Sequence, residues 1–189
     1  IQVKDMSAAL PAAAKSFYDK PDESLKIFGA TGTNGKTSLT WILQKMLSDI
    51  EGKCGLIGTI HYDLGGRRLP ANRTTPEALE LHAMFNQMRQ AGCKFAAMEV
   101  SSHAIAQNRV KGIKFDTLCF LNLTQDHLDY HKTMDEYFNV KASIFTGEYG
   151  DAPKNAVINF DDINGRKIAE KLSKETNLVS FGIDSNDAQ

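Results

Sequence analysis

The feature that most constrains this chain is a glycine-rich loop between a short apolar run and an amphipathic helix. The apolar run covers Leu25–Phe28, the loop covers Gly29–Thr37, and the helix is predicted over Lys36–Ile50. Glycines allow backbone N–H groups to close around phosphate oxygens, and the amino-terminal end of a helix adds a partial positive charge. The run Gly-Lys-Thr at the helix start favours a triphosphate site over a turn that merely joins two elements.

Two side chains of the loop have specific expected roles. Lys36 supplies a point charge for the β- and γ-phosphates, and the Thr37 hydroxyl is a candidate ligand of Mg²⁺. A strict form of the motif needs glycine at position 30, where this chain has Ala30. The sequence therefore predicts binding of ATP with Mg²⁺ through a variant loop. The expected nucleotide-binding residues of the loop are Gly32, Thr33, Asn34, Gly35, Lys36, Thr37 and Ser38.

Strand and helix signals alternate along most of the chain. Apolar runs of strand length occur at Leu25–Phe28, Cys54–Ile60, Phe95–Val100, Thr117–Leu123, Ala156–Phe160 and Leu178–Phe181. Helices are predicted at Met6–Tyr18, Lys36–Ile50, Pro76–Gln90, Met134–Phe145 and Ile163–Leu172, and a loop at Pro21–Ser24. This alternation predicts an α/β fold with a mostly parallel sheet flanked by helices. Ligands should then lie at the carboxyl ends of the strands, after Phe28, Ile60, Val100 and Leu123.

Composition narrows the classes of partner. The 22 basic and 23 acidic residues give a net charge of −1, which argues against a general nucleic-acid or membrane-surface binder. The 3 cysteines are far apart and form no Cys-x-x-Cys pair, which is typical of buried free thiols in a reducing compartment. No apolar stretch approaches the length of a membrane span, and the sequence shows no signal-peptide pattern. We therefore expect a cytoplasmic protein.

A second group of polar residues lies in Met98–His103, which closes an apolar strand. A carboxylate at a strand end beside a phosphate loop is well placed to hold Mg²⁺, so Glu99 is a candidate metal ligand. Without such a loop, Glu99 would be interpreted as a surface residue at the start of a helix. Ser101 lacks the Gly-x-Ser-x-Gly environment of a serine hydrolase, and a lone histidine such as His103 is more typical of packing than of catalysis.

A third polar group follows Thr117–Leu123 and contains two histidines. His127 and His131 are four residues apart, which on a helix would place both on one face. This spacing could indicate zinc, but no His-Glu-x-x-His motif or nearby cysteine accompanies it, so zinc is the weaker interpretation. Lys141, on the next predicted helix, would by itself be interpreted as a solvated lysine.

These motifs resemble those of the Mur ligase family, which includes the folylpolyglutamate synthetases. The loop Thr31–Thr37 reads Thr-Gly-Thr-Asn-Gly-Lys-Thr, as in that family. Met98–His103 with Arg109, and Asn72–Pro76 upstream, are similar to the MurE branch, the UDP-N-acetylmuramoyl-L-alanyl-D-glutamate ligases. Further segments that resemble the family are Leu121–His131, Asp135–Ser143 and Val157–Asp162, and the resemblance spans roughly Val3 to Asp184.

The resemblance implies roles for particular residues. It implies that the UDP-muramoyl dipeptide is contacted by Thr74, Thr75, Ser101 and Arg109. Hydroxyls and a guanidinium do suit carboxylate and pyrophosphate oxygens, although Thr74-Thr75 could equally form an ordinary turn before a proline. The resemblance places Asn122 near the nucleotide. The implied catalytic residues are Lys36, Glu99, His127 and Lys141, and the implied magnesium ligands are Thr37, Glu99, His127 and Lys141.

The resemblance also implies a covalent modification. Lys141 matches a lysine that CO₂ carbamylates in many family members, which turns a cation into an anionic oxygen ligand. Burial near Mg²⁺ and phosphate would favour that change. The same comparison of motifs gives Asp129 and His131 structural hydrogen-bonding roles and places Val157–Asp162 beside the nucleotide.

The implied function is an ATP-dependent amide ligase of peptidoglycan precursor synthesis. It would add L-lysine or meso-diaminopimelate to UDP-N-acetylmuramoyl-L-alanyl-D-glutamate through an acyl phosphate. Two alternatives stay open, namely another ligase of the superfamily such as folylpolyglutamate synthetase, and a non-catalytic ATP-binding module. We expect residues 1–23 to be the tail of an N-terminal domain with its linker, and residues 24–189 an incomplete central ATP-binding domain without the C-terminal domain. We expect a monomer, and little activity from these residues alone.

Overall fold

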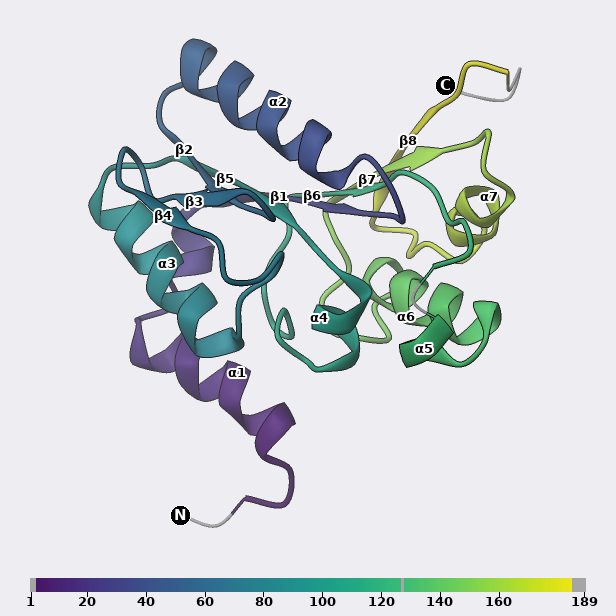
Figure 1. Ribbon diagram of the computed structural model, residues 1–189, viewed down its shortest axis with the longest axis horizontal. Helices are drawn as coiled ribbons and strands as arrows, with labels where there is room; N and C mark the ends of the chain where they lie inside the picture. The colour runs from purple at the N-terminus through teal and green to yellow at the C-terminus, as the bar shows by residue number, and fades with distance from the viewer. Residues whose placement is uncertain (1–2, 127, 185–189) are drawn as a thin grey trace.

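A mostly parallel sheet forms the middle layer of the protein (Figure 1). The structure is a computed structural model that describes residues 3–126 and 128–184. Within these residues the sheet has 8 strands in the order β4-β3-β2-β5-β1-β6-β7-β8. The strands are β1 (Lys26–Thr31), β2 (Cys54–Ile57), β3 (His61–Asp63), β4 (Arg68–Pro70), β5 (Phe95–Glu99), β6 (Thr117–Phe120), β7 (Asn155–Asn159) and β8 (Asn177–Phe181).

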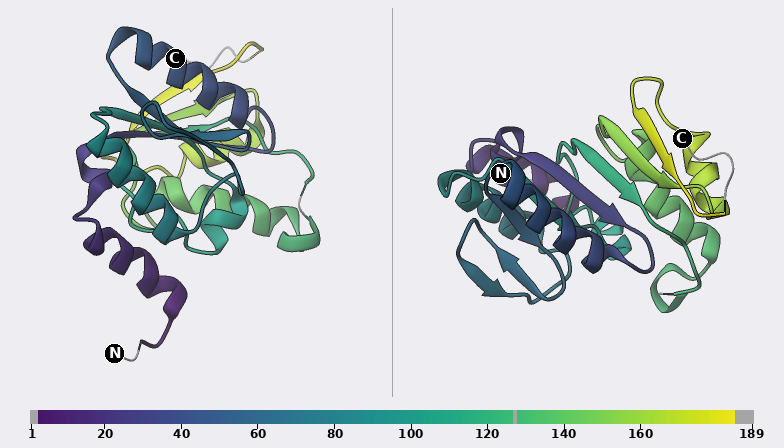
Figure 2. Two further views of the ribbon diagram at one scale, coloured as in Figure 1. Left: turned by 60° about the vertical axis from the view of Figure 1, so that its left-hand side comes forward. Right: turned by 90° about the horizontal axis from the view of Figure 1, so that it is seen from above.

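Helices cover both faces of the sheet, as the alternation of signals predicts. Figure 2 shows α2 over one face, while the helices around α3, α4 and α6 lie on the opposite face. The helices are α1 (Met6–Phe17), the 3₁₀ turn η1 (Pro21–Ser24), α2 (Lys36–Ile50), α3 (Ala78–Gln90), α4 (Ser102–Ala106), α5 (Leu128–His131), α6 (Met134–Thr146) and α7 (Ile163–Ala169). Among the described residues, every helix is too short or too polar to cross a bilayer.

The two faces of the sheet have separate apolar cores, because successive side chains of a strand point in opposite directions. On β5, Phe95 and Ala97 pack in the smaller core beneath α2, whereas Ala96 and Met98 belong to the larger core on the other face. All five residues of β5 are buried. Burial on both faces explains why the strand is a continuous apolar run rather than an alternating one.

The parallel strands and the long helices lie where the sequence predicts them, with ends shifted by a few residues. The strand expected over Cys54–Ile60 ends at Ile57, because the chain turns at Gly58. The run Thr117–Leu123 stops pairing at Phe120, where its partner β1 ends at Thr31. The antiparallel strands β3 and β4 and the short helices α4 and α5 were not predicted.

The first helix is tied to the body by a buried ion pair. Lys15 Nζ on α1 donates to Asp22 Oδ2 at 2.7 Å and to the carbonyl oxygen of Gly112 at 2.9 Å. Asp22 lies in η1 and is 1% exposed. Because a buried carboxylate is costly without a partner, this contact fixes where α1 joins the sheet layer.

Candidate functional site

The strand order places four strand ends around one point. Strand β1 lies between β5 and β6, and β2 lies on the other side of β5. These four strands are parallel, so their carboxyl ends meet at one edge of the sheet. The phosphate loop follows β1 there, at the position where ligands bind in open α/β sheets.

The phosphate loop has the backbone that its glycines predict. Gly35 has φ of 86° and Gly32 has φ of 150°, a region that favours glycine. At Gly32 a Cβ atom would also lie 3.0 Å from Cβ of Leu121. Ala30, which departs from the strict motif, is buried inside β1 and pairs with Glu99 and Cys119. Position 30 therefore needs strand geometry rather than a glycine turn.

The end of β6 holds the loop in place. The side-chain oxygen of Asn122 accepts the backbone N–H of Asn34 at 2.9 Å, and its amide donates to the Asn34 carbonyl at 3.2 Å. Thr33 N–H donates to the Asn122 carbonyl at 3.0 Å, and the Thr33 hydroxyl accepts the N–H of Thr124 at 3.0 Å. Asn122 was predicted near the nucleotide, and here it shapes the loop that would hold it.

The Lys36 side chain folds back onto the loop. Its ammonium donates to the carbonyl oxygens of Gly32 at 2.8 Å and Thr33 at 2.9 Å. Burial lowers the pKa of Lys36, while the nearby carboxylates of Glu99 and Asp126 oppose that shift. Ser38, also predicted at the nucleotide, lies exposed in the first turn of α2.

Glu99 is buried at the end of β5 and contacts the loop directly. It is 1% exposed, so it is not the surface residue that it would be without a phosphate loop. Its Oε2 accepts the Thr37 hydroxyl at 3.0 Å and the Thr59 hydroxyl at 3.2 Å, while its Oε1 accepts the Thr59 N–H at 2.8 Å. A Cβ atom on Gly58 would lie 2.5 Å from Oε1, so only glycine allows this approach.

The Thr37 and Glu99 oxygens suit Mg²⁺. A carboxylate and a hydroxyl are hard oxygen ligands, and Mg²⁺ usually takes one or two carboxylates and completes its shell with phosphates and water. In residues 3–126 and 128–184, no three His, Cys, Asp or Glu side chains gather into a metal cage of their own. That donor set fits an ion that arrives with a nucleotide.

Lys141 lies on α6 and is buried beside the loop. It is 1% exposed, in contrast to an ordinary solvated lysine. Its ammonium donates to Thr31 Oγ1 at 3.3 Å and to the Gly32 carbonyl at 3.2 Å, and lies 4.8 Å from the centre of the Tyr137 ring. Burial, with a smaller contribution from the charge of Lys36, lowers the pKa of Lys141 to about 7.

Tyr137 links Lys141 to the loop and to His131. Its hydroxyl lies 3.3 Å from Thr33 Oγ1, and its ring stacks on His131 with 5.1 Å between centroids. His131 is buried. The metal role predicted for His127 falls outside the described residues, as does the side chain of Asp129.

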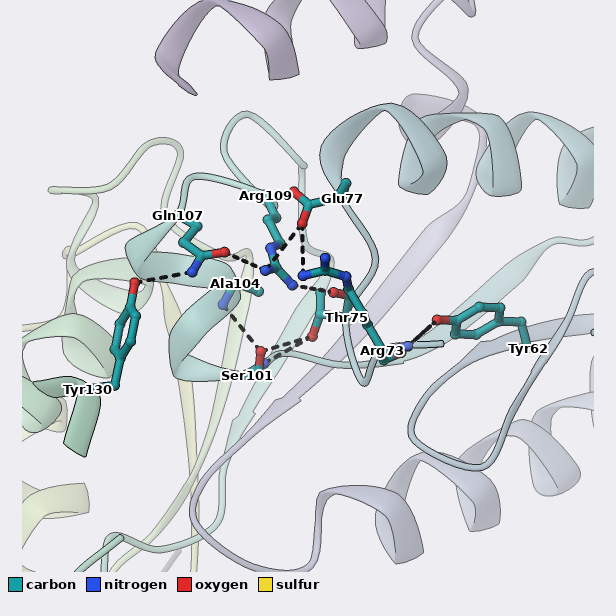
Figure 3. Close-up of polar contacts among 9 residues, drawn as sticks. All are labelled: Tyr62, Arg73, Thr75, Glu77, Ser101, Ala104, Gln107, Arg109 and Tyr130. Atoms are coloured by element: carbon teal, nitrogen blue, oxygen red, sulfur yellow. Dashed lines mark hydrogen bonds and ion pairs between the residues drawn. The ribbon is translucent and has the colours of Figure 1, made fainter. Parts of the chain in front are cut away.

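The four predicted substrate residues line one hollow of about 320 Å³ next to Glu99. Its lining consists of Arg73, Thr74, Thr75, Ser101, His103 and Arg109. Thr75 Oγ1 donates to the carbonyl oxygen of Glu99 at 2.8 Å and accepts the Ser101 N–H at 3.1 Å. Figure 3 shows Arg109 directed at the same turn, where it donates to the Thr75 carbonyl at 3.0 Å.

Ser101 and Thr74 complete the polar lining of this hollow. Ser101 caps α4, since its side chain accepts the N–H of Ala104 at 3.2 Å. The Thr74 hydroxyl lies 3.1 Å from that of Thr59. Thr59 thus stands between the hollow and the carboxylate of Glu99.

Several residues at this edge were not predicted. Thr59 supports Glu99, Gln107 donates to Tyr130 and contacts Arg109, and Glu77 bonds Arg73 and Arg109. A signal for Thr59 was its place after a buried strand, where polar residues meet in a parallel sheet. Asn159 and Asp162, from the segment predicted beside the nucleotide, bond the backbone on either side of Asn122. Asn159 donates to the Leu121 carbonyl oxygen and Asp162 accepts the Leu123 N–H.

A model of the Mur ligase middle domain matches residues 30–189 of this chain. A UDP-N-acetylmuramoyl-L-alanyl-D-glutamate–2,6-diaminopimelate ligase of Clostridium tetani is 44% identical over 181 residues, which cover 96% of this chain and 36% of that protein. The protein of the same name in Geobacillus kaustophilus is 48% identical over 166 residues, which cover 86% of this chain and 34% of that protein. The chain therefore spans little more than a third of the length of these curated relatives.

Solved structures agree with the fold. A structure of a UDP-N-acetylmuramoyl-L-alanyl-D-glutamate–2,6-diaminopimelate ligase superposes with a TM-score of 0.78 at 29% identity, covering 97% of this chain and 37% of that one. A Mycobacterium tuberculosis folylpolyglutamate synthase complexed with ADP and AMPPCP superposes with a TM-score of 0.69 at 16% identity. The superposition covers 92% of this chain and 46% of that one. The second likeness concerns the fold alone.

Proposed function

Because this chain belongs to the Mur ligase family, we propose that it is the nucleotide-binding part of an ATP-dependent amide ligase. The reaction would extend UDP-N-acetylmuramoyl-L-alanyl-D-glutamate by one amino acid during peptidoglycan precursor synthesis in the cytoplasm. The amino acid we propose is 2,6-diaminopimelate, because the relatives in Clostridium tetani and Geobacillus kaustophilus carry that compound in their names. L-Lysine is the alternative.

One observation carries this proposal, namely that Glu99 joins the two halves of the site. Its carboxylate accepts the hydroxyl of Thr37 in the phosphate loop, and its backbone carbonyl accepts the hydroxyl of Thr75 in the neighbouring hollow. An acyl phosphate forms only if a carboxylate of the second substrate lies against the terminal phosphate of ATP. A shared residue between the two sites provides that proximity.

The chain's own residues would do most of the work by positioning and charge. Lys36 and the N–H groups of the loop would stabilise the charge that develops on the transferring phosphoryl group. Thr37 and Glu99 would hold Mg²⁺, which neutralises phosphate charge when it is bound. Thr74, Thr75, Ser101 and Arg109 would hold the dipeptide so that its free carboxylate faces the phosphate. The amine would then attack the acyl phosphate and release inorganic phosphate.

Lys141 supports a further part of this proposal. At a pKa of about 7 a sizeable fraction of the side chain is an uncharged amine at neutral pH. Its lone pair can form an N–C bond to CO₂ with release of one proton, giving the carbamate that the family resemblance implies. In that form the residue would present oxygen atoms toward the loop, and with His127 it would be a ligand of a second Mg²⁺.

We further propose that residues 24–189 belong to the central ATP-binding domain and residues 1–23 to the linker region that leads into it. The match of the family model from residue 30 onward supports the first part. The end of α1 and the turn η1 are tied to the sheet layer by Lys15 and Asp22, which would fix how the linker enters the domain.

The test of the ligase activity uses the full-length protein. It is supplied with ATP, Mg²⁺ and UDP-N-acetylmuramoyl-L-alanyl-D-glutamate, and 2,6-diaminopimelate and L-lysine are added separately while phosphate release is followed. We expect release with diaminopimelate. No release with either amine would refute the ligase assignment and leave a non-catalytic ATP-binding module. Release with a folate substrate instead would assign another branch of the superfamily.

A loop variant checks that the release comes from this site. Lys36→Ala should lower the rate about 10²–10³-fold, because it removes a charge on the transferring phosphoryl group. Lys45→Ala is the matched control, since Lys45 is exposed on the same helix α2. An equal loss in both variants would place the activity elsewhere.

A further inference from the structure

The hollow next to Glu99 carries a second guanidinium that the motifs did not single out. Arg73 Nη1 lies 3.1 Å from Glu77 Oε1, and Arg109 Nη2 lies 3.2 Å from the same oxygen. Figure 3 shows the carboxylate of Glu77 joined to both guanidinium groups. One carboxylate oxygen is therefore shared by two arginines that come from different segments of the chain.

Glu77 does not have the contact usual for its position. It is the N-cap residue of α3, yet its side chain makes no capping hydrogen bond. Short side chains such as Ser or Asp cap helices well, whereas the longer side chain here extends to the arginines instead. Its side chain is 45% exposed, so an entering ligand can displace it without opening the core.

Arg73 combines a backbone held by hydrogen bonds with a half-exposed side chain. The Tyr62 hydroxyl accepts the Arg73 N–H at 3.1 Å and donates to the Arg73 carbonyl at 2.6 Å. Tyr62 lies on β3 and is 4% exposed. The guanidinium of Arg73 is half-exposed at the wall of the hollow. Only its side chain has to move to meet a ligand, which limits the ordering cost of binding.

The charge balance favours an external anion. Two guanidinium groups face one carboxylate, so the cluster keeps a net positive charge with Glu77 in place. Nε of Arg109 is buried, and within the described residues it has no hydrogen-bond partner. Arg109 also lines a second hollow, of about 300 Å³, together with Glu77 and Gln107. A carboxylate or phosphate with free oxygens could use donors that Glu77 leaves unused.

We propose that Arg73 and Arg109 form an anion-binding subsite and that Glu77 is a built-in competitor, displaced when the ligand's anionic group binds. This inference rests on the proposed function, because the ligand is the muramoyl dipeptide nucleotide of that reaction. The group that binds is either a carboxylate of the dipeptide or the diphosphate of the nucleotide. Arg73 is then a substrate-binding residue, and Tyr62 is the positioning residue that holds its backbone.

The experiment measures binding to the full-length protein by calorimetry, with L-alanyl-D-glutamate and UDP as separate probes. Glu77→Gln removes the competing charge and keeps the shape, so the probe that uses the subsite should bind about three- to tenfold more tightly. Glu80→Gln is the matched control, since Glu80 is exposed in the first turn of the same helix. Arg73→Gln should weaken the same probe about three- to tenfold.

The direction in which Glu77→Gln changes the affinity of the probe shows whether Glu77 competes with the ligand. If Glu77 instead holds Arg109 in its binding position, Glu77→Gln weakens the probe, and the inference is wrong. Unchanged affinity in Glu77→Gln or Arg73→Gln overturns it as well. Binding of ATP with Mg²⁺ is measured on every variant. If ATP binds normally and the substitutions change the affinity of neither probe, this inference alone is wrong. If the wild-type protein does not bind ATP, the proposed function is wrong.

Discussion

Lys36 and Lys141 donate hydrogen bonds to one acceptor, the carbonyl oxygen of Gly32, at 2.8 and 3.2 Å. Two ammonium groups at one oxygen are unfavourable unless one of them loses its proton. Lys141 is the more deeply buried, and burial together with the charge of Lys36 lowers its pKa to about 7. Near neutral pH, part of Lys141 is therefore an uncharged amine.

The first prediction concerns stability and pH. Unfolded Lys141 has the ordinary pKa of 10.5, so between pH 7 and 10.5 the unfolded state holds a proton that the folded state has released. Stability should therefore rise with pH across this window, by about 1 kcal/mol per pH unit. Urea unfolding of the ligand-free protein at about pH 7, 8 and 9 measures this slope. Carbon dioxide is excluded so that the amine stays unmodified.

Lys141→Met provides the comparison that isolates this residue. It keeps a long apolar side chain and cannot titrate, so the difference between wild type and variant cancels the other groups. The variant should be more stable than the wild type near pH 7, and its advantage should shrink as the pH rises. A difference that stays constant with pH would show that Lys141 keeps its proton in the folded state.

The second prediction concerns Thr59, which donates two hydrogen bonds to Glu99. Thr59→Val keeps the shape and the backbone N–H but loses the hydroxyl, so Glu99 should turn more freely. The Mg²⁺ concentration needed for half-maximal ATP binding should rise about fivefold. Thr59→Ser should behave as the wild type. If the valine variant matches the serine variant, the hydroxyl does not orient Glu99.

A third prediction concerns the loop support from β6. Asn122→Ala removes both side-chain hydrogen bonds to Asn34. ATP affinity should fall about three- to tenfold, because the loop must now be ordered when the nucleotide binds. Fluorescence titration with a labelled ATP analogue measures this loss. Asn177→Ala, at an exposed side chain that donates to Asn155 Oδ1 at the start of β7, on the opposite edge of the sheet, should leave affinity unchanged.

The fourth prediction concerns thiol reactivity. All three cysteines, Cys54, Cys93 and Cys119, are buried and free. Burial raises the pKa of Cys54 to about 12 and that of Cys119 to about 11, so the reactive thiolate is scarce at pH 8. The folded protein should not react with a disulfide reagent over minutes, and the unfolded protein should release 3 equivalents. Rapid reaction of the native protein would contradict the burial of these thiols.

The parallel sheet could be predicted because each of its central strands is a continuous apolar run. Within the predicted runs, Phe95–Met98 and Leu118–Leu121 contain no polar residue. Strands β3 and β4 could not be predicted, because each has three residues and owes its structure to pairing with its neighbour. Short strands of this kind carry too little local preference to be seen in the sequence.

The site was predictable where a motif names the residue. Thr37, Glu99, Asn122 and Lys141 come together at the loop, and Thr74, Thr75, Ser101 and Arg109 line one hollow. Glu77 and Thr59 could not be predicted, because their roles depend on the residues that contact them from other segments of the chain. A glutamate before a helix and a threonine after a strand are ordinary until their partners are known.

The hairpin of β3 and β4 forms one edge of the described sheet. Strand β4 is the outer strand on that side of the sheet, and an unpaired outer strand invites a second chain to add to it. Here the strand is only three residues long, begins with the exposed Arg68 and ends with Pro70, which has no N–H to donate. The segment that holds Arg73 through Tyr62 thus also makes this edge of the sheet a poor template for the addition of another strand.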